Sequence, residues 1–211
     1  MTRKRRTIED LKRRKPFRTP NKAELIVCEG SITEPQYFNE LKRKLRLSSV
    51  QIDVVASRGE SEPINIVERA ISKKREGARQ GVPYSNIWCV MDVEVPARHE
   101  SLEKAMVKAK DNKVEIILSN PFFEYWLLLH FEKILTPFNE DKELHSALKA
   151  IHQTYKKTWI GFDILYPHTE TAIKHSEEVL KETGCTEDLR DYNPSTHVHR
   201  LVEHLQNIER R

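Results

Sequence analysis

Short hydrophobic runs alternate with longer stretches of helical periodicity over more than half of the chain. The runs have the length of buried strands and are rich in Val, Ile and Leu; they cover residues 24–28, 50–56, 86–91 and 114–119. Strands that alternate with helices favour right-handed β-α-β crossovers. The pattern therefore predicts an α/β, Rossmann-like fold with about four parallel strands flanked by helices.

Hydrophobic stripes with helical spacing occupy the intervals between these strands. Thr33 and Gln36 have the spacing of a capping box, which would start the first helix. Further stripes at residues 64–71 and 102–109 predict the second and third helices.

The fourth strand is followed by a stretch that is apolar on nearly all sides of a helix. Asn120 is a favoured N-cap residue, and Pro121 suits the first helical position. Glu124 is the polar exception within this buried helix. It either complements the helix N-terminus or acts as a metal ligand or base, because the helix begins at the carboxyl edge of the predicted sheet.

The remainder of the chain is helical and poor in strands. Periodicity predicts helices over residues 144–151, 173–180 and 198–205. We expect residues 23–135 to form the α/β core and residues 136–211 to form a helical extension that caps it.

Two histidines, His197 and His199, begin the last predicted helix. On a helix the two rings of such a pair point to different sides, which disfavours a shared metal ion. Contact with phosphate and a plain solvated helix are the alternatives.

Acidic residues follow two of the predicted strands at the point where each ends. Glu29 comes directly after the first strand, and Asp92 and Glu94 come after the third. A carboxylate at the end of a buried strand is costly unless a positive charge compensates it. Residues two apart on an extended segment face the same side, so Asp92 and Glu94 can address one site.

The ligand crevice of an open α/β sheet lies beyond the carboxyl ends of its strands. If the first and third strands are neighbours, Glu29, Asp92 and Glu94 offer hard oxygen ligands to one Mg²⁺ or Mn²⁺. Gly30 would let a phosphate approach the backbone at the start of the next helix. Lys22, Arg58 and Lys113 are basic residues placed to contact phosphate, although Arg58 also fits an ordinary loop.

Charge divides the chain into a basic start and a mildly acidic body. Residues 1–22 hold ten Lys or Arg residues against two acidic ones, a net charge of +8, and the rest of the 211-residue chain carries −4. This arm is either a solvated flexible tail or a nucleic-acid contact. No run is long enough to span a bilayer, the start lacks a secretory signal, and three distant cysteines suggest no disulfide framework. We expect a cytoplasmic protein without membrane contact.

Four ordered blocks of the sequence resemble the RloB family. They are residues 26–38 (IVCEG followed by TEP and YF), 88–94 (WCVMDVE), 119–131 (SNPFFEYWLLLHF) and 193–200 (NPST-x-VHR). The resemblance implies a Toprim-like domain, the Rossmann-like metal-binding module of topoisomerases, primases and OLD-family nucleases. It also implies a bacterial or archaeal defence setting, such as abortive infection, and an ATPase partner of the AAA or ABC type.

The Toprim pattern transfers residue by residue. Its glutamate matches Glu29, and its paired acidic motif matches Asp92 and Glu94, where the longer Glu stands in for the usual Asp. Glu34 is similar to a second acidic residue of OLD-type nucleases, with one residue more between it and the first. The last block places His199 and Arg200 among the expected substrate contacts, and the third block adds Asn120.

These interpretations together predict a Mg²⁺- or Mn²⁺-dependent nuclease that cleaves RNA, with tRNA as one candidate, or DNA. The catalytic candidates are Glu29, Asp92 and Glu94, with Glu34 and Glu124. Two alternatives stay open: a non-catalytic adaptor that docks on nucleic acid or an ATPase, and a nucleotidyltransferase of the primase kind. The sequence leaves both a monomer and a homodimer open.

Overall fold

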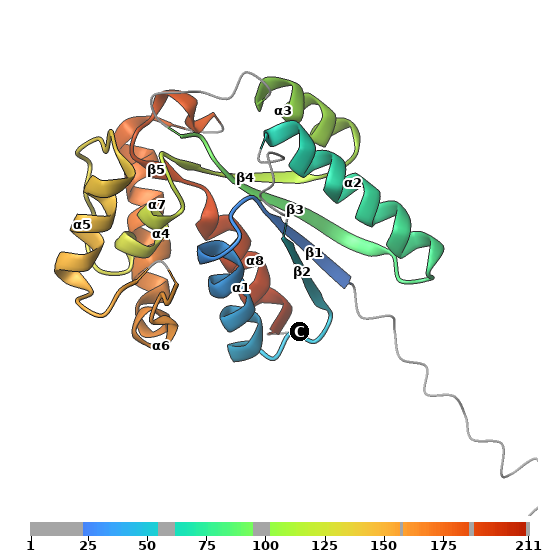
Figure 1. Ribbon diagram of the computed structural model, residues 1–211, viewed down its shortest axis with the longest axis horizontal. Coiled ribbons are helices and arrows are strands. Elements are labelled where there is room, and N and C mark those ends of the chain that lie inside the picture. The colour runs from blue at the N-terminus through green and yellow to red at the C-terminus, as the bar shows by residue number, and fades with distance from the viewer. Residues whose placement is uncertain (1–22, 55–61, 95–101, 157, 186–187, 210–211) are drawn as a thin grey trace, which may run out of the picture.

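A mostly parallel sheet forms the centre of the molecule in the computed structural model, which describes residues 23–54, 62–94, 102–156, 158–185 and 188–209 (Figure 1). The strand order is β2-β1-β3-β4-β5, and only the β4–β5 pairing is antiparallel. The strands are β1 (Ala23–Cys28), β2 (Val50–Val54), β3 (Tyr84–Asp92), β4 (Glu115–Asn120) and β5 (Ser195–Thr196).

Helices cover both faces of the sheet. The α-helices are α1 (Thr33–Lys44), α2 (Pro63–Arg79), α3 (Leu102–Asp111), α4 (Glu124–Leu129), α5 (Asp141–Ile151), α6 (Phe162–Leu165), α7 (Thr169–Thr183) and α8 (Val198–Glu209). Short 3₁₀ helices lie at η2 (Tyr166–His168) and η3 (Leu189–Asp191). The predicted α/β class, the four parallel strands and the flanking helices are confirmed.

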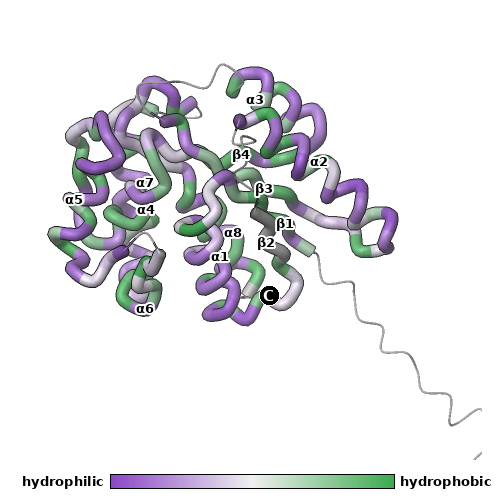
Figure 2. Tube along the Cα trace, viewed as in Figure 1, coloured by the Kyte–Doolittle hydropathy of each residue, from purple (hydrophilic) through white to green (hydrophobic). Residues whose placement is uncertain are grey.

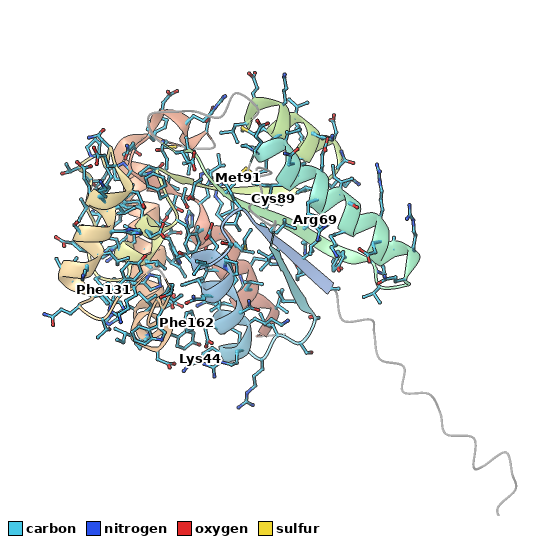
Figure 3. The ribbon with its side chains drawn as sticks, in the orientation of Figure 1. Lys44, Arg69, Cys89, Met91, Phe131 and Phe162 are labelled. Carbon is cyan, nitrogen blue, oxygen red and sulfur yellow. The ribbon has the colours of Figure 1, made fainter. Side chains whose placement is uncertain are left out.

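Alternate residues of β1 serve opposite faces of the sheet, as its pleating requires. Leu25 and Val27 belong to a hydrophobic cluster with α2 and α3, and Ile26 and Cys28 to a second cluster with α1, α4, α7 and α8. Figure 3 shows Cys89 and Met91 of β3 on the side of α2 and α3. Burial on both faces explains why the strands are nearly continuous apolar runs.

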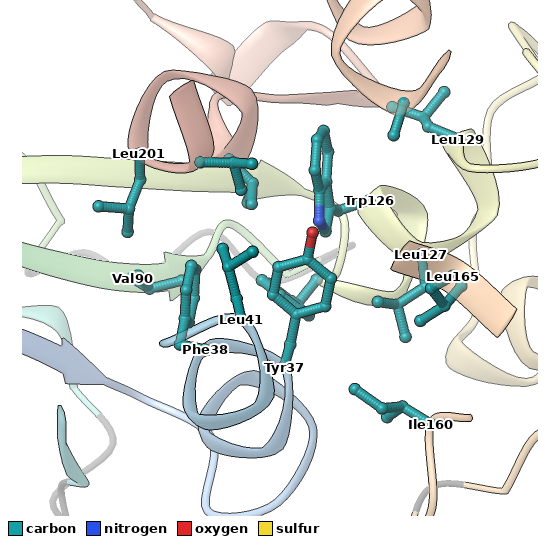
Figure 4. Packing of buried hydrophobic residues seen from close by; sticks show 14 of the residues in the cluster. Tyr37, Phe38, Leu41, Val90, Trp126, Leu127, Leu129, Ile160, Leu165 and Leu201 are labelled. Atoms are coloured by element: carbon teal, nitrogen blue, oxygen red, sulfur yellow. The ribbon is translucent and has the colours of Figure 1, made fainter. Parts of the chain in front are cut away.

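The larger cluster joins the first half of the chain to the C-terminal helices. Tyr37 and Leu41 of α1 face Val90 of β3, Trp126 of α4 and Leu201 of α8 (Figure 4). Helix α4 is hydrophobic along most of its length and is buried throughout (Figure 2). The division of the chain at residue 135 stays a prediction, and this cluster includes residues from both sides of it.

The order of strands reverses at β1: β2 is added on one side of it, and β3 is added on the other. Strand β1 pairs with both neighbours, and α1 lies on the face opposite to α2 and α3. Open α/β sheets bind ligands at such a switch point, outside the carboxyl ends of the strands. The adjacency that the sequence argument assumed is therefore present, and it brings the ends of β1 and β3 together.

Two predicted helix caps are wrong, and one strand was not predicted. Thr33 is the first residue of α1 and Gln36 donates to the Thr158 carbonyl, so neither makes a capping box. Asn120 ends β4, and α4 begins only at Glu124 without a side-chain cap. Strand β5 is two residues long, too short to leave a periodic signal.

The structure also bears on membrane-spanning helices and on the basic segment at the start of the chain. Within the part of the chain that the structure describes, no helix is both long enough and apolar enough to cross a membrane. The basic segment at residues 1–22 lies outside the described residues.

Candidate metal centre

The carboxyl ends of β1 and β3 are joined by two hydrogen bonds that fix Glu29. The Glu29 backbone N–H donates to the Val90 carbonyl at 3.0 Å, which continues the parallel ladder one residue beyond β1. The Glu29 carboxylate in turn accepts from the Asp92 backbone N–H at 3.0 Å. The side chain of one strand end is thus held against the backbone of the other.

A pocket of about 400 Å³ opens at these strand ends. Among the described residues that line it, none is Lys or Arg, whereas six are acidic: Glu29, Glu34, Asp92, Glu94, Glu124 and Asp141. The structure therefore brings together all five acidic residues that the sequence singled out and adds Asp141.

The acidic side chains raise one another's affinity for protons. Burial, opposed by the hydrogen bond from the Asp92 N–H, raises the pKa of Glu29 to about 7, and the carboxylates of Glu94 and Glu34 add to the rise. Burial also raises the pKa of Asp92 well above its usual value, and the neighbouring carboxylates of Glu34, Glu29, Glu124 and Glu94 reinforce that shift. The cluster is electrostatically unfavourable by itself.

One oxygen of Asp92 also lacks a favourable partner. Asp92 Oδ1 is buried and has no hydrogen-bond partner among the described residues. A buried acceptor without a donor is costly, and a hard divalent cation is the partner that carboxylate oxygens at such a site favour. The residues present therefore fit Mg²⁺ or Mn²⁺, with Glu29, Asp92 and Glu94 as the ligand set.

Glu34 is fixed by the glycine that follows Glu29. Its carboxylate accepts from the Gly30 N–H at 3.0 Å, and it lies in the first turn of α1, where a negative charge is favourable. A Cβ atom at Gly30 would collide with this carboxylate. The Gly30 N–H that the sequence argument offered to a phosphate is thus bonded to Glu34.

Glu94 reaches the pocket through an unusual backbone conformation. Its φ of 51° lies in the left-handed region, which costs a non-glycine residue roughly 1 kcal/mol. The neighbouring backbone is held by bonds from Val93 N–H to the Ser119 carbonyl at 2.8 Å and from Glu94 N–H to the Pro121 carbonyl at 3.1 Å. Asp92 and Glu94 line the same pocket, as predicted, although Glu94 reaches it through this left-handed conformation and not through the alternation of an extended segment.

Comparison with known families finds a match over most of the chain. A family model described as RloB-like protein matches residues 24–205, which run from β1 into α8 and include every acidic residue of the pocket. The chain belongs to the RloB-like family. No curated protein and no solved structure matches it.

The sequence of this RloB-like chain did not single out Asp141, which lines the pocket, or His145, which lies beside it on α5. Asp141 and His145 lie one turn apart on α5, and His145 Nε2 is 3.6 Å from Glu124 Oε1. Glu124 also accepts from the Thr33 hydroxyl at 3.1 Å, which ties α4 to the start of α1. An acidic residue and a histidine four apart on a helix share one face, and this spacing is the signal that could have drawn attention to them.

Asn120 and Lys113 do not lie in the pocket of the RloB-like chain. Asn120 Nδ2 donates to the carbonyl groups of Leu189 and Arg190, at 2.6 Å and 3.3 Å, so its side chain holds the η3 turn. Lys113 precedes β4 and therefore lies at the opposite edge of the sheet. Lys22 and Arg58 lie outside the described residues.

The histidines at the start of α8 are buried, so the expectation of a solvated helix there is wrong. His199 Nδ1 lies 2.8 Å from the Ser176 hydroxyl of α7, and burial, with help from His197 and Arg200, lowers the pKa of His199 to about 4. Neither His199 nor Arg200 lines the acidic pocket. The placement of His199 supports a packing role between α7 and α8.

Proposed function

We propose that this chain is a Mg²⁺- or Mn²⁺-dependent nuclease of the Toprim type that cleaves phosphodiester bonds in RNA or DNA. The observation that carries the proposal is the meeting of Glu29, Asp92 and Glu94 in one pocket at the switch point of the sheet, with a buried and unpaired Asp92 oxygen. When bound, a divalent cation at such a site supplies Lewis-acid stabilisation of phosphodiester oxygens and activation of water.

The protein groups have distinct tasks in this proposal. The Asp92 N–H orients the Glu29 carboxylate, and the Gly30 N–H orients Glu34. The bond from Val93 to Ser119 of β4 and the bond from Glu94 to Pro121 just after β4 hold the Asp92–Glu94 segment in place. Since these supports are backbone groups, the ligands are positioned before a cation arrives, which reduces the cost of binding.

The substrate and biological setting rest on family resemblance. An acidic pocket repels a polyanion unless a cation is present, so substrate binding is expected to require metal as well as basic segments of the chain. The basic arm at residues 1–22 is the segment that best suits this contact. Antiviral defence by abortive infection, with an ATPase partner, is the setting that we propose.

Cleavage assays with labelled single-stranded RNA, tRNA and duplex DNA test the proposal. We expect Mg²⁺- or Mn²⁺-dependent cleavage by the native chain and a loss of about 10³-fold in Asp92→Asn and Glu29→Gln, since each removes a ligand charge. Glu115→Gln is the matched control, because Glu115 is exposed at the opposite end of β4. Equal cleavage by the Glu29→Gln/Asp92→Asn double variant and the native chain would overturn the proposal.

A further inference from the structure

A second group of metal-ligating side chains lies on the wall of the acidic pocket formed by α4 and α5. Glu124 begins α4, Asp141 begins α5, and His145 follows one turn later. One ligand atom from each of the three lies within 4.8 Å of the others. His145 Nε2 is 3.6 Å from Glu124 Oε1 and 3.5 Å from Asp141 Oδ1, so a nitrogen faces two carboxylates.

Local structure holds these three groups in place. Residues four apart on a helix share one face, which directs Asp141 and His145 to the same side of α5. A capping box formed by Glu140 and Glu143 fixes the start of that helix. Glu124 is only 5% exposed and accepts from Thr33, so its carboxylate cannot easily turn to water.

The hydroxyl of Tyr155 is an independent sign that the cluster is incomplete. Tyr155 is 5% exposed, its Oη atom has no hydrogen-bond partner among the described residues, and its ring lies 5.9 Å from the His145 ring. Burial raises the Tyr155 pKa, and the carboxylates of Glu124 and Asp141 raise it further, with Glu124 also acting through its contact with the hydroxyl. The Glu124 carboxylate is the acceptor nearest to this buried hydroxyl, yet the hydroxyl makes no hydrogen bond of ordinary geometry to it.

We infer that Glu124, Asp141 and His145 form a second divalent-cation site, one suited to a transition ion such as Mn²⁺. The ligand set distinguishes it from the strand ends: Glu29, Asp92 and Glu94 offer only carboxylate oxygens, which suit Mg²⁺, whereas an imidazole nitrogen shifts preference toward transition ions. Tyr155 completes the site as an outer hydroxyl partner of the ion's ligands.

The second site lies within the same pocket as the first. Glu124 and Asp141 line that pocket together with Glu29 and Asp92, so the two ions would occupy one cavity. The inference goes beyond the proposed nuclease, since it concerns the binding of a cation and stands whether or not the chain cleaves nucleic acid.

Mn²⁺ titration of the full chain by calorimetry, with paramagnetic resonance of the bound ion, tests this site. We expect about two Mn²⁺ ions per native chain and about one in His145→Ala, His145→Gln and Asp141→Asn. The bound Mn²⁺ of the native chain should show coupling to a ¹⁴N nucleus, and that coupling should disappear in both His145 variants. His168→Ala and Glu115→Gln are the controls, because His168 is exposed and Glu115 lies at the far end of β4.

Asp92→Asn separates this inference from the proposed function. If both sites exist, Asp92→Asn loses the ion at the strand ends and keeps the ¹⁴N-coupled Mn²⁺ at His145. Circular dichroism of each variant verifies that it is folded. Unchanged Mn²⁺ stoichiometry and affinity in folded His145→Ala, or an absence of ¹⁴N coupling in the native chain, would overturn the second site and leave the strand-end site standing.

Discussion

Strand β1 has a glutamate near each end, and the two have opposite surroundings. Glu24, at the start, is 1% exposed and accepts from Asn86 Nδ2 at 2.9 Å and Trp88 Nε1 at 3.2 Å, with His204 Nε2 at 3.1 Å. Glu29, just past the other end, has one backbone donor and several carboxylate neighbours. The first carboxylate is surrounded by donors, whereas the second has one donor and is otherwise surrounded by carboxylates.

The difference shows what burial of a carboxylate can mean. Donors from β3 and α8 surround Glu24, so its burial joins α8 to the sheet and is a structural feature. Around Glu29 the neighbouring side chains repel, and one oxygen of nearby Asp92 is unpaired. Repulsion that a protein maintains at a ligand crevice indicates a functional site, and a cation is the ligand that would relieve it.

Matched amide substitutions at Glu24 and Glu29 should change stability in opposite directions. In metal-free protein at pH 8, Glu24→Gln should lower the free energy of unfolding by about 2 kcal/mol, because the new amide NH₂ opposes the donors of Asn86 and Trp88. Glu29→Gln should raise it by about 2 kcal/mol, because it removes a charge from a repulsive cluster. Urea denaturation measures both values.

These two predictions would be contradicted if both substitutions changed the free energy of unfolding in the same direction. If Glu29→Gln destabilises metal-free protein as Glu24→Gln does, the strand-end cluster is not repulsive. Glu115→Gln, at an exposed position, should change the stability by less than about 0.5 kcal/mol and calibrates the measurement.

The stability of the metal-free protein should also depend on pH through Glu29. The folded-state pKa of Glu29, raised from 4.5 to about 7, exceeds its unfolded value, so its contribution to stability is full below pH 4.5 and is lost as pH rises to about 7. Between pH 5 and pH 8, metal-free native protein should therefore lose about 2 kcal/mol more than Glu29→Gln does. Denaturation series at the two pH values give this difference; equal losses would show that Glu29 is not perturbed.

Gly30→Ala should have the smallest effect of the three. The new methyl group displaces the Glu34 carboxylate from the Gly30 N–H, which disturbs the pocket but leaves Glu29, Asp92 and Glu94 in place. We expect roughly tenfold weaker Mg²⁺ binding, about 1.4 kcal/mol, by calorimetry. Gly81→Ala is the comparison variant: its φ of 77° strains an alanine and lowers stability, but a Cβ there meets no atom within 4 Å and Gly81 does not line the pocket, so Mg²⁺ affinity should not change. Unchanged Mg²⁺ affinity in Gly30→Ala would show that the position of Glu34 does not affect metal binding.

Periodicity and strand-end chemistry were sufficient to predict the sheet and the position of the acidic pocket. The runs around Ile26 and Val90 are continuous because the strands are buried on both faces, and parallel strands necessarily bring Glu29 and Asp92 to one edge. These features follow from local pattern plus one assumption about strand order. The sheet and the position of the pocket could therefore be predicted without knowledge of any tertiary contact.

The errors arose where a distant partner decides the role of a side chain. Thr33 bonds to Glu124 and Asn120 bonds to the η3 backbone, so neither caps its own helix. His199 is buried because Ser176 of α7 packs against it. Asp141 enters the pocket because α5 docks on α4; the four-residue spacing to His145 marks a shared helix face, but the sequence does not say which element that face meets.

Thermal unfolding with and without Mg²⁺ tests whether the carboxylates at the ends of β1 and β3 bind a cation. If the strand-end carboxylates hold a cation, saturating Mg²⁺ should raise the unfolding midpoint of the native chain and of His145→Ala by several degrees, and should leave Asp92→Asn unchanged. Glu24→Gln, although less stable, should keep the full Mg²⁺ shift. The same Mg²⁺-induced rise in Asp92→Asn as in the native chain, or no rise in any of them, would contradict the account.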